Sequence, residues 1–422
     1  MATEVREATP PHRMQCSSET SALIEKLLHV ARQATRMEVA WVSSFGDGFQ
    51  VFEVLAGKAE RFGLTVGRSP SLDGSYCVRA LDGRLSNVVR DSTVDGVARD
   101  LAVTLDLGIG SYLGVPIPGP GAEPMGMLCC VSRSANEVLG DDDLRFVALL
   151  AGAVSALLQD DRVEGDRQRR IRDRVGRVIR QGRLQAHLQP IMGLATGAVV
   201  GAEALARFPA EPTRPDLWFA EAASVGLGGA LERAAVLAAL VHLPALPADT
   251  YLSINASPDL LCSGALGATL AGVAPARIVI ELTEHEAVSD YGELAGALAP
   301  LRASGVRLAV DDVGAGFASF AHVLRLQPDI LKMDMSITTD IDRDPARRGL
   351  ARAIVSVAGD IGATVVAEGV ETQPELDTVA HLGIDAAQGF FLARPAAGPL
   401  PTHLPRPAAP GRSDAGRAAG SG

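Results

Sequence analysis

The sequence lacks the long apolar segments of a membrane protein. Its longest nearly apolar run, residues 146–158, is too short to cross a bilayer core of about 30 Å as a helix. The N-terminus does not show the basic and then apolar pattern of a secretory signal. We therefore expect a cytoplasmic protein with no membrane insertion.

Cysteine is also scarce. The five cysteines are scattered, odd in number and without the spacing of metal ligands, which suits a reducing compartment better than a disulfide framework. We interpret them as small packing residues. They are Cys16, Cys77, Cys129, Cys130 and Cys262.

Basic residues are fewer than acidic residues in this sequence. The 39 Lys and Arg residues face 50 Asp and Glu residues, which gives a formal net charge of -11. Because affinity for a nucleic-acid duplex comes largely from phosphate neutralisation, this balance predicts no nucleic-acid partner. A small phosphate ligand is still compatible with it, since local metals or a single arginine can hold one.

The composition indicates a folded protein of two domains. A chain of 422 residues is too long for one typical core, and 47% hydrophobic with 21% charged residues is enough to bury one in each half. The expected division is a disordered N-terminus over 1–18, an α+β domain over 19–158, a connecting helix over 159–181, a barrel over 182–395 and a disordered tail over 396–422.

The segment 19–158 predicts an α+β domain. A helical pattern opens it, short strand-like runs follow between Gly-containing turns, and an apolar helix with three aspartates in its first turn closes it. Two motifs, LGIGSYLGVPIP and GMLCCVS, resemble the GAF family of ligand-sensing domains. GAF domains bind cyclic nucleotides, haem, bilins or no small molecule, so the resemblance leaves the sensor ligand unknown. At Cys77 a packed thiol is favoured over a chromophore or redox thiol, because no basic cluster adjoins it.

The segment 182–395 predicts a (β/α)8 TIM-type barrel, so the fold class is α/β for this half. Eight strand-like runs recur every 20 to 50 residues with helical stretches between them. Active sites of such barrels lie at the C-terminal ends of the strands. Polar residues occur late in these runs: Glu203, Asn255, Glu281, Asp311, Asp312, Lys332, Glu368 and Gln388.

Each of these polar residues alone has an ordinary interpretation as a cap or a surface group. Together, five carboxylates at one mouth repel each other strongly and need cations to coexist. The ligands are all oxygen and none of the eight histidines has a metal spacing, which favours Mg²⁺ or Mn²⁺ over Zn²⁺. The adjacent pair Asp311 and Asp312 suits two ions about 3.5 to 4 Å apart, the arrangement that activates water against a phosphodiester.

The ordered blocks LQPI, EALAR, SINAS, IELTE, DDVGAG, ILKMD, AEGVET and QGFFLARP resemble the EAL-domain family of cyclic di-GMP phosphodiesterases. The resemblance covers about half of the chain and implies hydrolysis of cyclic di-GMP to linear pGpG with two Mg²⁺ or Mn²⁺ ions. It implies that the metal ligands are Glu203, Asn255, Glu281, Asp311 and Glu368, with Asp312 serving the second ion.

The resemblance also assigns the remaining site residues. Lys332 orients or deprotonates the attacking water, Gln388 helps to hold the cluster of metals and water, and Glu284 fastens the loop after Asp312. Beside two cations, Lys332 is expected to have a depressed pKa. The implied substrate contacts are Gln189, Leu205 and Arg207.

One loop departs from the family pattern. The family usually has D-D-F-G-[ST]-G, whereas this chain has Val313 in place of the aromatic residue and Ala315 in place of the hydroxyl. The departure predicts a looser loop and puts loop anchoring in doubt. We expect the protein to form a homodimer, and coupling between its subunits through this loop is equally in doubt.

Three functions remain open from the sequence. The first is an active phosphodiesterase that the sensor domain regulates through the connecting helix. The second is a catalytically weak receptor or recruiting module for cyclic di-GMP, which the complete metal set disfavours. The third is a barrel acting on another phosphoester, which the implied substrate contacts disfavour.

Overall fold

The structure of the protein is a computed structural model. This structure describes residues 16–46, 49–67, 74–209, 214–282, 288, 290–315, 317–401 and 404–407. The chain divides into two compact units, Met1–Arg169 and Arg170–Gly422. Among the described residues, no helix combines the length and the apolar character needed to cross a membrane.

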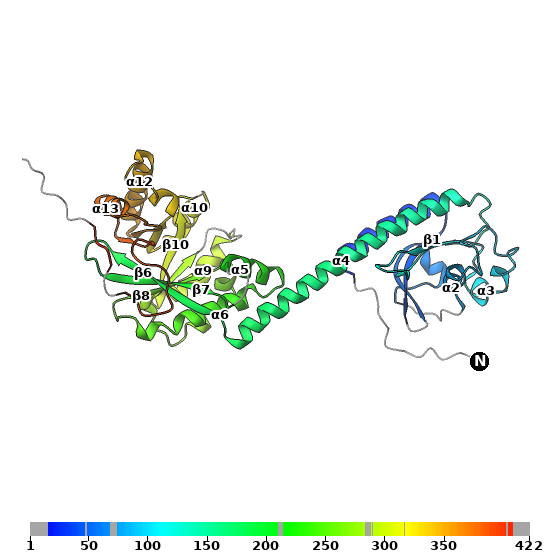
Figure 1. The fold of residues 1–422 in the computed structure, drawn as a ribbon, viewed down its shortest axis with the longest axis horizontal. Coiled ribbons are helices and arrows are strands. Elements are labelled where there is room, and N and C mark those ends of the chain that lie inside the picture. The colour runs from blue at the N-terminus through cyan, green and yellow to red at the C-terminus, as the bar shows by residue number, and fades with distance from the viewer. Residues whose placement is uncertain are drawn as a thin grey trace, which may run out of the picture. The chain divides into compact units, whose positions relative to one another are not determined.

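The first unit is built on an antiparallel sheet that contains β1 (Figure 1). The strand order of this sheet is β2-β1-β5-β4-β3. Its strands are β1 (Val39–Gly46), β2 (Phe49–Gly57), β3 (Val88–Val89), β4 (Ser111–Ile117) and β5 (Gly126–Ser132). Its helices are α1 (Ser18–Thr35), α2 (Tyr76–Leu81), α3 (Ala102–Leu107) and the first part of α4 (Asp141–Gln181).

Each face of this sheet carries its own core. One cluster joins α1 and α4 to the sheet, for example through Leu28, Cys130 and Val147. The other contains Trp41, Tyr112 and α2. Because successive side chains of a strand point to opposite faces, the neighbours Cys129 and Cys130 fall into different cores. This arrangement is the α+β domain that the sequence predicted.

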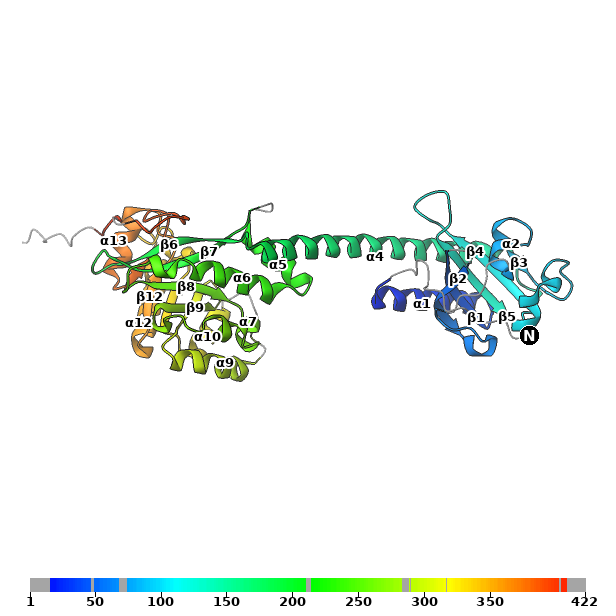
Figure 2. The same cartoon turned by 90° about the horizontal axis from the view of Figure 1, so that it is seen from below.

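Two expectations at the domain boundaries need correction. The closing helix of the first domain and the connecting helix are one unbroken helix, α4 (Figure 2). The expected disordered N-terminus is too long, since Ser17 caps α1 and Ser18 begins it. Residues 1–15 lie outside the described part of the chain.

The second unit is a closed eight-stranded barrel with the order β10-β11-β12-β13-β6-β7-β8-β9, so the predicted fold class is confirmed. The strands are β6 (Gln185–Gly193), β7 (Val199–Arg207), β8 (Tyr251–Ala256), β9 (Ile278–Leu282), β10 (Arg307–Val313), β11 (Ile330–Met333), β12 (Thr364–Ala367) and β13 (Ala386–Ala387). The helices are α5 (Pro215–Ser224), α6 (Gly228–Leu240), α7 (Pro258–Cys262), α8 (Ala265–Thr269), α9 (Tyr291–Ala303), α10 (Phe317–Leu326), α11 (Met335–Thr338), α12 (Pro345–Ile361) and α13 (Gln373–His381).

The first strand does not follow the expected strand-helix pattern. β6 pairs antiparallel with both β7 and β13, whereas the other neighbours pair in parallel. Only residues 194–198 separate β6 from β7. A parallel pair needs a crossover of about a dozen residues, so this short connection enforces a hairpin.

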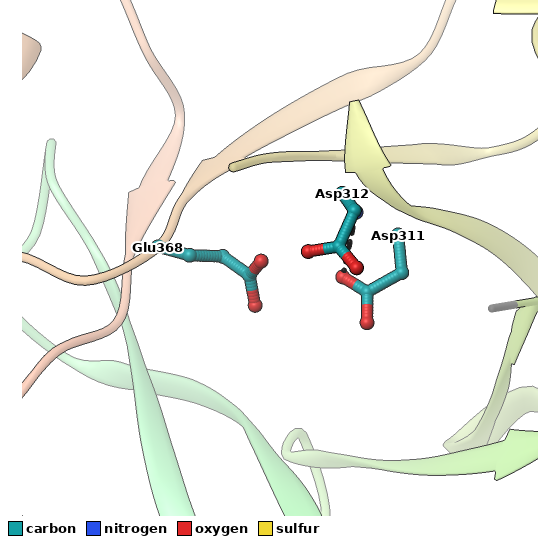
Figure 3. A group of neighbouring side chains, drawn as sticks. All are labelled: Asp311, Asp312 and Glu368. Atoms are coloured by element: carbon teal, nitrogen blue, oxygen red, sulfur yellow. Dashed lines mark hydrogen bonds between the residues drawn. The ribbon is translucent and has the colours of Figure 1, made fainter. Parts of the chain in front are cut away.

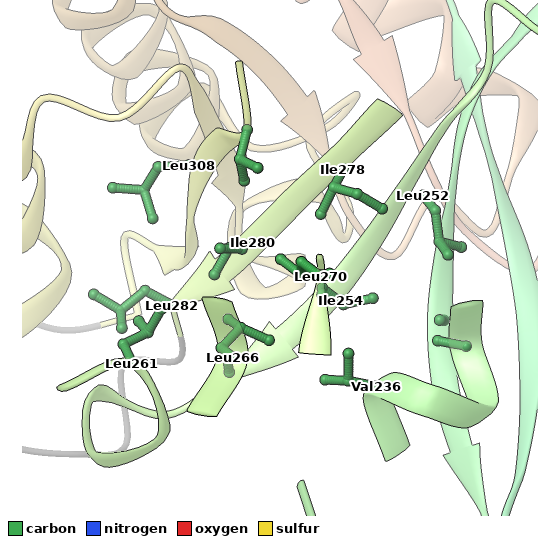
Figure 4. Close-up of a cluster of buried hydrophobic side chains, with 14 of the residues drawn as sticks. Val236, Leu252, Ile254, Leu261, Leu266, Leu270, Ile278, Ile280, Leu282 and Leu308 are labelled. Atoms are coloured by element: carbon green, nitrogen blue, oxygen red, sulfur yellow. The ribbon is translucent and has the colours of Figure 1, made fainter. Parts of the chain in front are cut away.

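Apolar clusters fill the space between the barrel and its helices. One of them packs Leu252, Ile254 and Ile280 of the strands against Val236 of α6 and Leu266 of α8 (Figure 4). A second cluster surrounds β10 to β13 and α12. These cores fix the strands that carry the polar residues described below.

The segment after the last strand also packs on the second unit. The backbones of Leu188 and Ala396 exchange two hydrogen bonds of 2.8 and 3.1 Å. Leu400 and Leu404 contact the two clusters around the barrel. The expected start of disorder at Ala396 is therefore wrong, while residues 408–422 lie outside the described part.

Candidate active site

The barrel interior consists of an apolar layer and a polar layer above it. The apolar layer contains Ile191, Tyr251, Val279, Ala309, Ile330, Val366 and Ala386, and Gly201 lies against the Tyr251 ring. Residues two positions apart on a strand face the same side. Moving two positions toward the mouth from each of these residues gives what we call the mouth layer: Gln189, Glu203, Ser253, Glu281, Asp311, Lys332, Glu368 and Gln388.

Glycine at position 201 leaves the space that the Tyr251 ring fills in the apolar layer. A Cβ at this position would lie 2.3 Å from the Tyr251 ring, so only glycine leaves room for the ring. On β6 the mouth residue Gln189 precedes the apolar residue Ile191, because this strand runs in the opposite direction. The polar residues therefore converge through strand periodicity and barrel closure.

Lys332 is the centre of the mouth layer. It is 1% exposed, and its Nζ atom lies 2.9 Å from Glu281, 2.9 Å from Glu368, 3.0 Å from Asp311 and 3.4 Å from Glu203. It is the single lysine of the second unit, where every other basic side chain besides histidine is arginine. The compact ammonium group reaches four carboxylates at once, which the flat guanidinium of arginine is not shaped to do.

A hydrogen-bond network orients the carboxylates around Lys332. Gln388 donates from Nε2 to Glu203 at 2.6 Å and to Gln189 at 3.0 Å. Asn255 donates to Glu203 at 3.4 Å, and Ser253 donates to Glu281 at 2.6 Å. Ser253 was not predicted as a site residue from the sequence, although its position two residues before Asn255 places it on the same face of β8.

A bulge in β10 turns two aspartates toward the mouth. The pairing with β11 shifts between Val310 and Val313, so Asp311 and Asp312 together stand opposite Lys332. Asp312 has φ +52°, a left-handed conformation that aspartate tolerates better than most residues. In a regular strand these two neighbours would point to opposite sides, whereas here both carboxylates face Glu368 (Figure 3).

The mouth layer and the adjacent Asp312 together offer oxygen ligands that fit hard divalent cations. Oxygen atoms of Asp311, Asp312 and Glu368 lie within 4.8 Å of one another, a group that could hold a metal ion. The nearby Glu203 and Glu281 add further carboxylate oxygens, and the single ammonium of Lys332 does not balance five carboxylates. All the donors are oxygen, the ligand type that Mg²⁺ and Mn²⁺ prefer.

The pKa values reflect this excess of negative charge. Burial raises the pKa of Glu281 to about 8, with a further contribution from Glu203 that Lys332 opposes. Burial also raises the pKa of Glu368 well above its ordinary value. For Lys332 burial lowers the pKa, but the four neighbouring carboxylates, Asp311 foremost, raise it well above the ordinary range. The depressed pKa expected for Lys332 depends on neighbouring cations, since the protein's own groups act in the opposite direction.

A cavity of about 350 Å³ lies at the ends of β7 and β8, between these strands and the helices α5 and α6, and none of the described residues that line it belongs to the mouth layer. We call it the mouth cavity. Leu205, Arg207 and Asn255 line it, and so do Asp216 and Phe219 of α5. Gln189, also expected to contact a ligand, is 6% exposed and bonds instead to Gln388 and to the carbonyl of Ala393.

The loop after Asp312 is described in part. Val313 is fully buried in the cluster around β10 to β13, and the Ala315 amide donates to the Asp312 carbonyl at 3.1 Å. Gly314 has φ +108°, and a Cβ there would lie 2.3 Å from Ile337. Glu284, expected to fasten this loop, lies outside the described residues, so the looser loop stays a prediction.

The last turns of α4 pack against the wall of the mouth cavity. Ile171, Val175 and Val178 of α4 share one apolar cluster with Trp218 and Ala222 of α5. α5 therefore contacts α4 through Trp218 and lines the cavity through Phe219.

Trp218 joins this wall to β7. Its buried ring stacks on Phe208, which follows Arg207, with the centroids 4.6 Å apart and the planes 3° from parallel. The Arg174 guanidinium of α4 lies 4.6 Å from the Trp218 ring centre and pairs with Glu221.

The fold and site define an α/β barrel with an acidic mouth centred on one buried lysine, preceded in the chain by an α+β domain built on a five-stranded sheet. Comparison with known families makes this assignment specific. The chain belongs to the EAL domain family, whose model matches residues 169–395, and a GAF domain model matches residues 17–159. Both predicted resemblances are thereby confirmed.

Individual relatives agree with this assignment. An uncharacterized protein of Azorhizobium caulinodans is 33% identical over 55% of this chain and 34% of its own length. The cyclic di-GMP phosphodiesterase NbdA of Pseudomonas aeruginosa is 29% identical over 70% of this chain and 38% of its own. The chain thus spans well under half the length of these curated relatives.

Solved structures include similar barrels. The Xanthomonas citri FimX EAL domain in complex with c-diGMP is 24% identical, covers 57% of this chain and 98% of its own, and has a TM-score of 0.50, which supports the fold. Klebsiella pneumoniae BlrP1 in a calcium and cy-diGMP complex is 33% identical over 51% of this chain and 57% of its own, with a TM-score of 0.47.

Proposed function

We propose that the barrel hydrolyses cyclic di-GMP to linear pGpG and that the GAF domain regulates this activity through α4. The observation that carries the proposal is the mouth layer, where a buried lysine is shared by four carboxylates and a fifth lies beside them. The phosphodiesterase NbdA, which is similar over most of the chain, supports the choice of substrate.

Glu203, Asn255, Glu281, Asp311, Asp312 and Glu368 would hold two Mg²⁺ or Mn²⁺ ions. When bound, such ions lower the pKa of water and stabilise charge that develops on a phosphoryl oxygen. Lys332 would then accept or orient the proton of the attacking water, and Gln388 holds Glu203 in position for this arrangement.

The mouth cavity gives the substrate a place beside this layer. Arg207 offers a guanidinium that can pair with a phosphate, and Leu205 with Phe219 offers apolar surface for a base. In this proposal the chain is an enzyme and not only a receptor, because all of the implied ligands are retained.

The full chain is expected to convert cyclic di-GMP to pGpG when Mn²⁺ is present and to lose this activity in EDTA. Chromatographic separation of substrate and product measures the conversion, with the same protein and Mn²⁺ returned after EDTA as the control. Turnover that EDTA leaves unchanged would contradict the proposed metal site. Binding of cyclic di-GMP without any product would favour the receptor alternative.

The contact between α4 and α5 gives a second expected result. Arg174→Ala should raise KM for cyclic di-GMP by about threefold to tenfold, because the contact with Trp218 and the partly buried ion pair with Glu221 together contribute about 1 kcal/mol to the position of the cavity wall. We expect kcat to stay within about twofold, since no atom of the mouth layer is removed.

Arg307→Ala is the matched control for Arg174→Ala. Arg307 lies 4.6 Å from the ring centre of Tyr251, the same type of contact at the same distance, but it stands at the beginning of β10. Initial rates over a range of substrate concentrations give both constants. An equal increase in KM for the two variants would show that α5 has no special link to the cavity.

A further inference from the structure

The first unit holds two cysteine sulfurs in contact. The Sγ atoms of Cys77 in α2 and Cys129 in β5 lie 3.5 Å apart, although 52 positions separate the two residues in the sequence. Both side chains are buried, with exposed fractions of 2% and 0%. A disulfide requires an S–S distance of about 2.05 Å, so a small movement of α2 toward the sheet would bring the sulfurs within bonding range.

The two thiols have different surroundings. Cys77 lines a cavity of about 300 Å³ in the first unit, together with Trp41, Phe52 and Tyr76. Gln50 donates a hydrogen bond from Nε2 to the Cys77 sulfur at 3.2 Å and so fixes its position at the cavity wall. Cys77 is therefore the thiol that a small molecule in the cavity would meet first.

Cys129 lies behind Cys77 and does not line the cavity. Its sulfur is 3.7 Å from the Tyr112 hydroxyl, and burial, with the Cys77 contact, raises the pKa of its thiol well above the usual range. A thiol of this kind reacts poorly with an oxidant from solution. It is nevertheless held against Cys77, and such proximity favours reaction between the two sulfurs.

We propose that Cys77 and Cys129 form a redox-sensitive dithiol that a small hydroperoxide, such as hydrogen peroxide, converts to an intramolecular disulfide. This inference does not depend on the activity of the barrel. It makes the first unit a sensor of oxidants, in addition to any ligand that its cavity binds.

The chemistry balances in two steps. The Cys77 sulfur attacks one oxygen of hydrogen peroxide, the O–O bond breaks, and the leaving hydroxide takes up the thiol proton as water, which leaves a sulfenic acid. The Cys129 sulfur then attacks the Cys77 sulfur, the S–O bond breaks, and the hydroxyl leaves as water with the Cys129 proton. Overall, two thiols and one peroxide give one disulfide and two waters.

Cys130 is a matched control that the chain itself provides. It follows Cys129 directly and is equally buried, but it faces the core formed with α1 and α4. Burial raises the pKa of its thiol to about 12. Cys130 should therefore take no part in the disulfide, although it adjoins Cys129 in the sequence.

The reduced full chain can be exposed to a small molar excess of hydrogen peroxide, blocked with N-ethylmaleimide and digested without reductant. Mass spectrometry should show a peptide pair that joins Cys77 to Cys129 and disappears after reduction. Cys130→Ser should keep this linked pair, Cys77→Ser should lose it, and Cys129→Ser should leave a Cys77 sulfenic acid that dimedone traps.

The partly exposed Cys16 and Cys262 report how much oxidant acted on the same molecules. If these two residues are oxidised while Cys77 and Cys129 both remain free thiols in the parent protein, the proposal is wrong. It is also wrong if Cys130→Ser abolishes the linked pair while near-ultraviolet circular dichroism shows an intact fold. The peptide readout keeps this test separate from the test of phosphodiesterase activity.

Discussion

Lys332→Ala is expected to lower kcat for cyclic di-GMP by about 10² or more, because it removes the group placed to act on the attacking water. The affinity for cyclic di-GMP should stay near that of the parent, since Lys332 is buried and is not among the lining residues of the mouth cavity. Rates at saturating substrate, together with calorimetric titration in Ca²⁺, separate the two quantities.

The same substitution should change stability in a metal-dependent way. In EDTA the loss of Lys332 leaves four buried carboxylates without their shared cation, and breaking a buried ion pair typically costs about 3–5 kcal/mol. Mn²⁺ should restore much of the lost thermal stability, because it binds the folded state. Lys58→Ala, at a lysine of the first unit, is the control. An unchanged kcat in Lys332→Ala would mean that another group is the base.

Glu203→Gln is expected to abolish hydrolysis within the limits of detection. Glu203 accepts hydrogen bonds from Gln388 and Asn255 and lies 3.4 Å from Lys332, so it connects both sides of the mouth layer. The amide keeps the size of the side chain but removes a charge that no neighbour replaces, which weakens the hold on a divalent ion.

The effect of Glu203→Gln should appear in both activity and metal affinity. Calorimetric titration with Mn²⁺ should show weaker binding, and product formation should not recover at high Mn²⁺. Glu293→Gln, at an exposed position in the first turn of α9, provides the control for a general loss of negative charge. Parental turnover in Glu203→Gln would remove Glu203 from the proposed set of ligands.

The sequence predicted most of the barrel because two local signals agree there. Strand-like runs such as RIVIELTE recur between helical stretches, and those of β8 to β13 carry a polar residue two positions after an apolar one. That spacing places Val279 in the apolar layer and Glu281 in the mouth layer. Barrel closure then brings together residues as distant in sequence as Glu203 and Gln388.

Other features depend on geometry that residue patterns do not encode. The bulge that turns both Asp311 and Asp312 inward is a property of the pairing of β10 with β11, and the left-handed backbone of Asp312 has no signature of its own. The contact between Cys77 and Cys129 depends on where α2 lies on the sheet. The hairpin of β6 and β7, in contrast, is predictable from the sequence, because the connection between the two strand-like runs is too short to contain a helix.

The reversed direction of β6 has a consequence for protein engineering. Gln185, where β6 starts, pairs with Arg207, where β7 ends, so the chain joins the barrel at its open rim. In an all-parallel barrel the preceding module would be attached at the far end, away from the reacting groups. A foreign input domain spliced into α4 would therefore be connected at the rim that lies near the mouth layer. With about 3.6 residues per turn, inserts of seven residues nearly preserve the side of α4 that faces Trp218, whereas inserts of two turn it by about 200°. Helical phase thus becomes a design variable for making this barrel respond to new inputs.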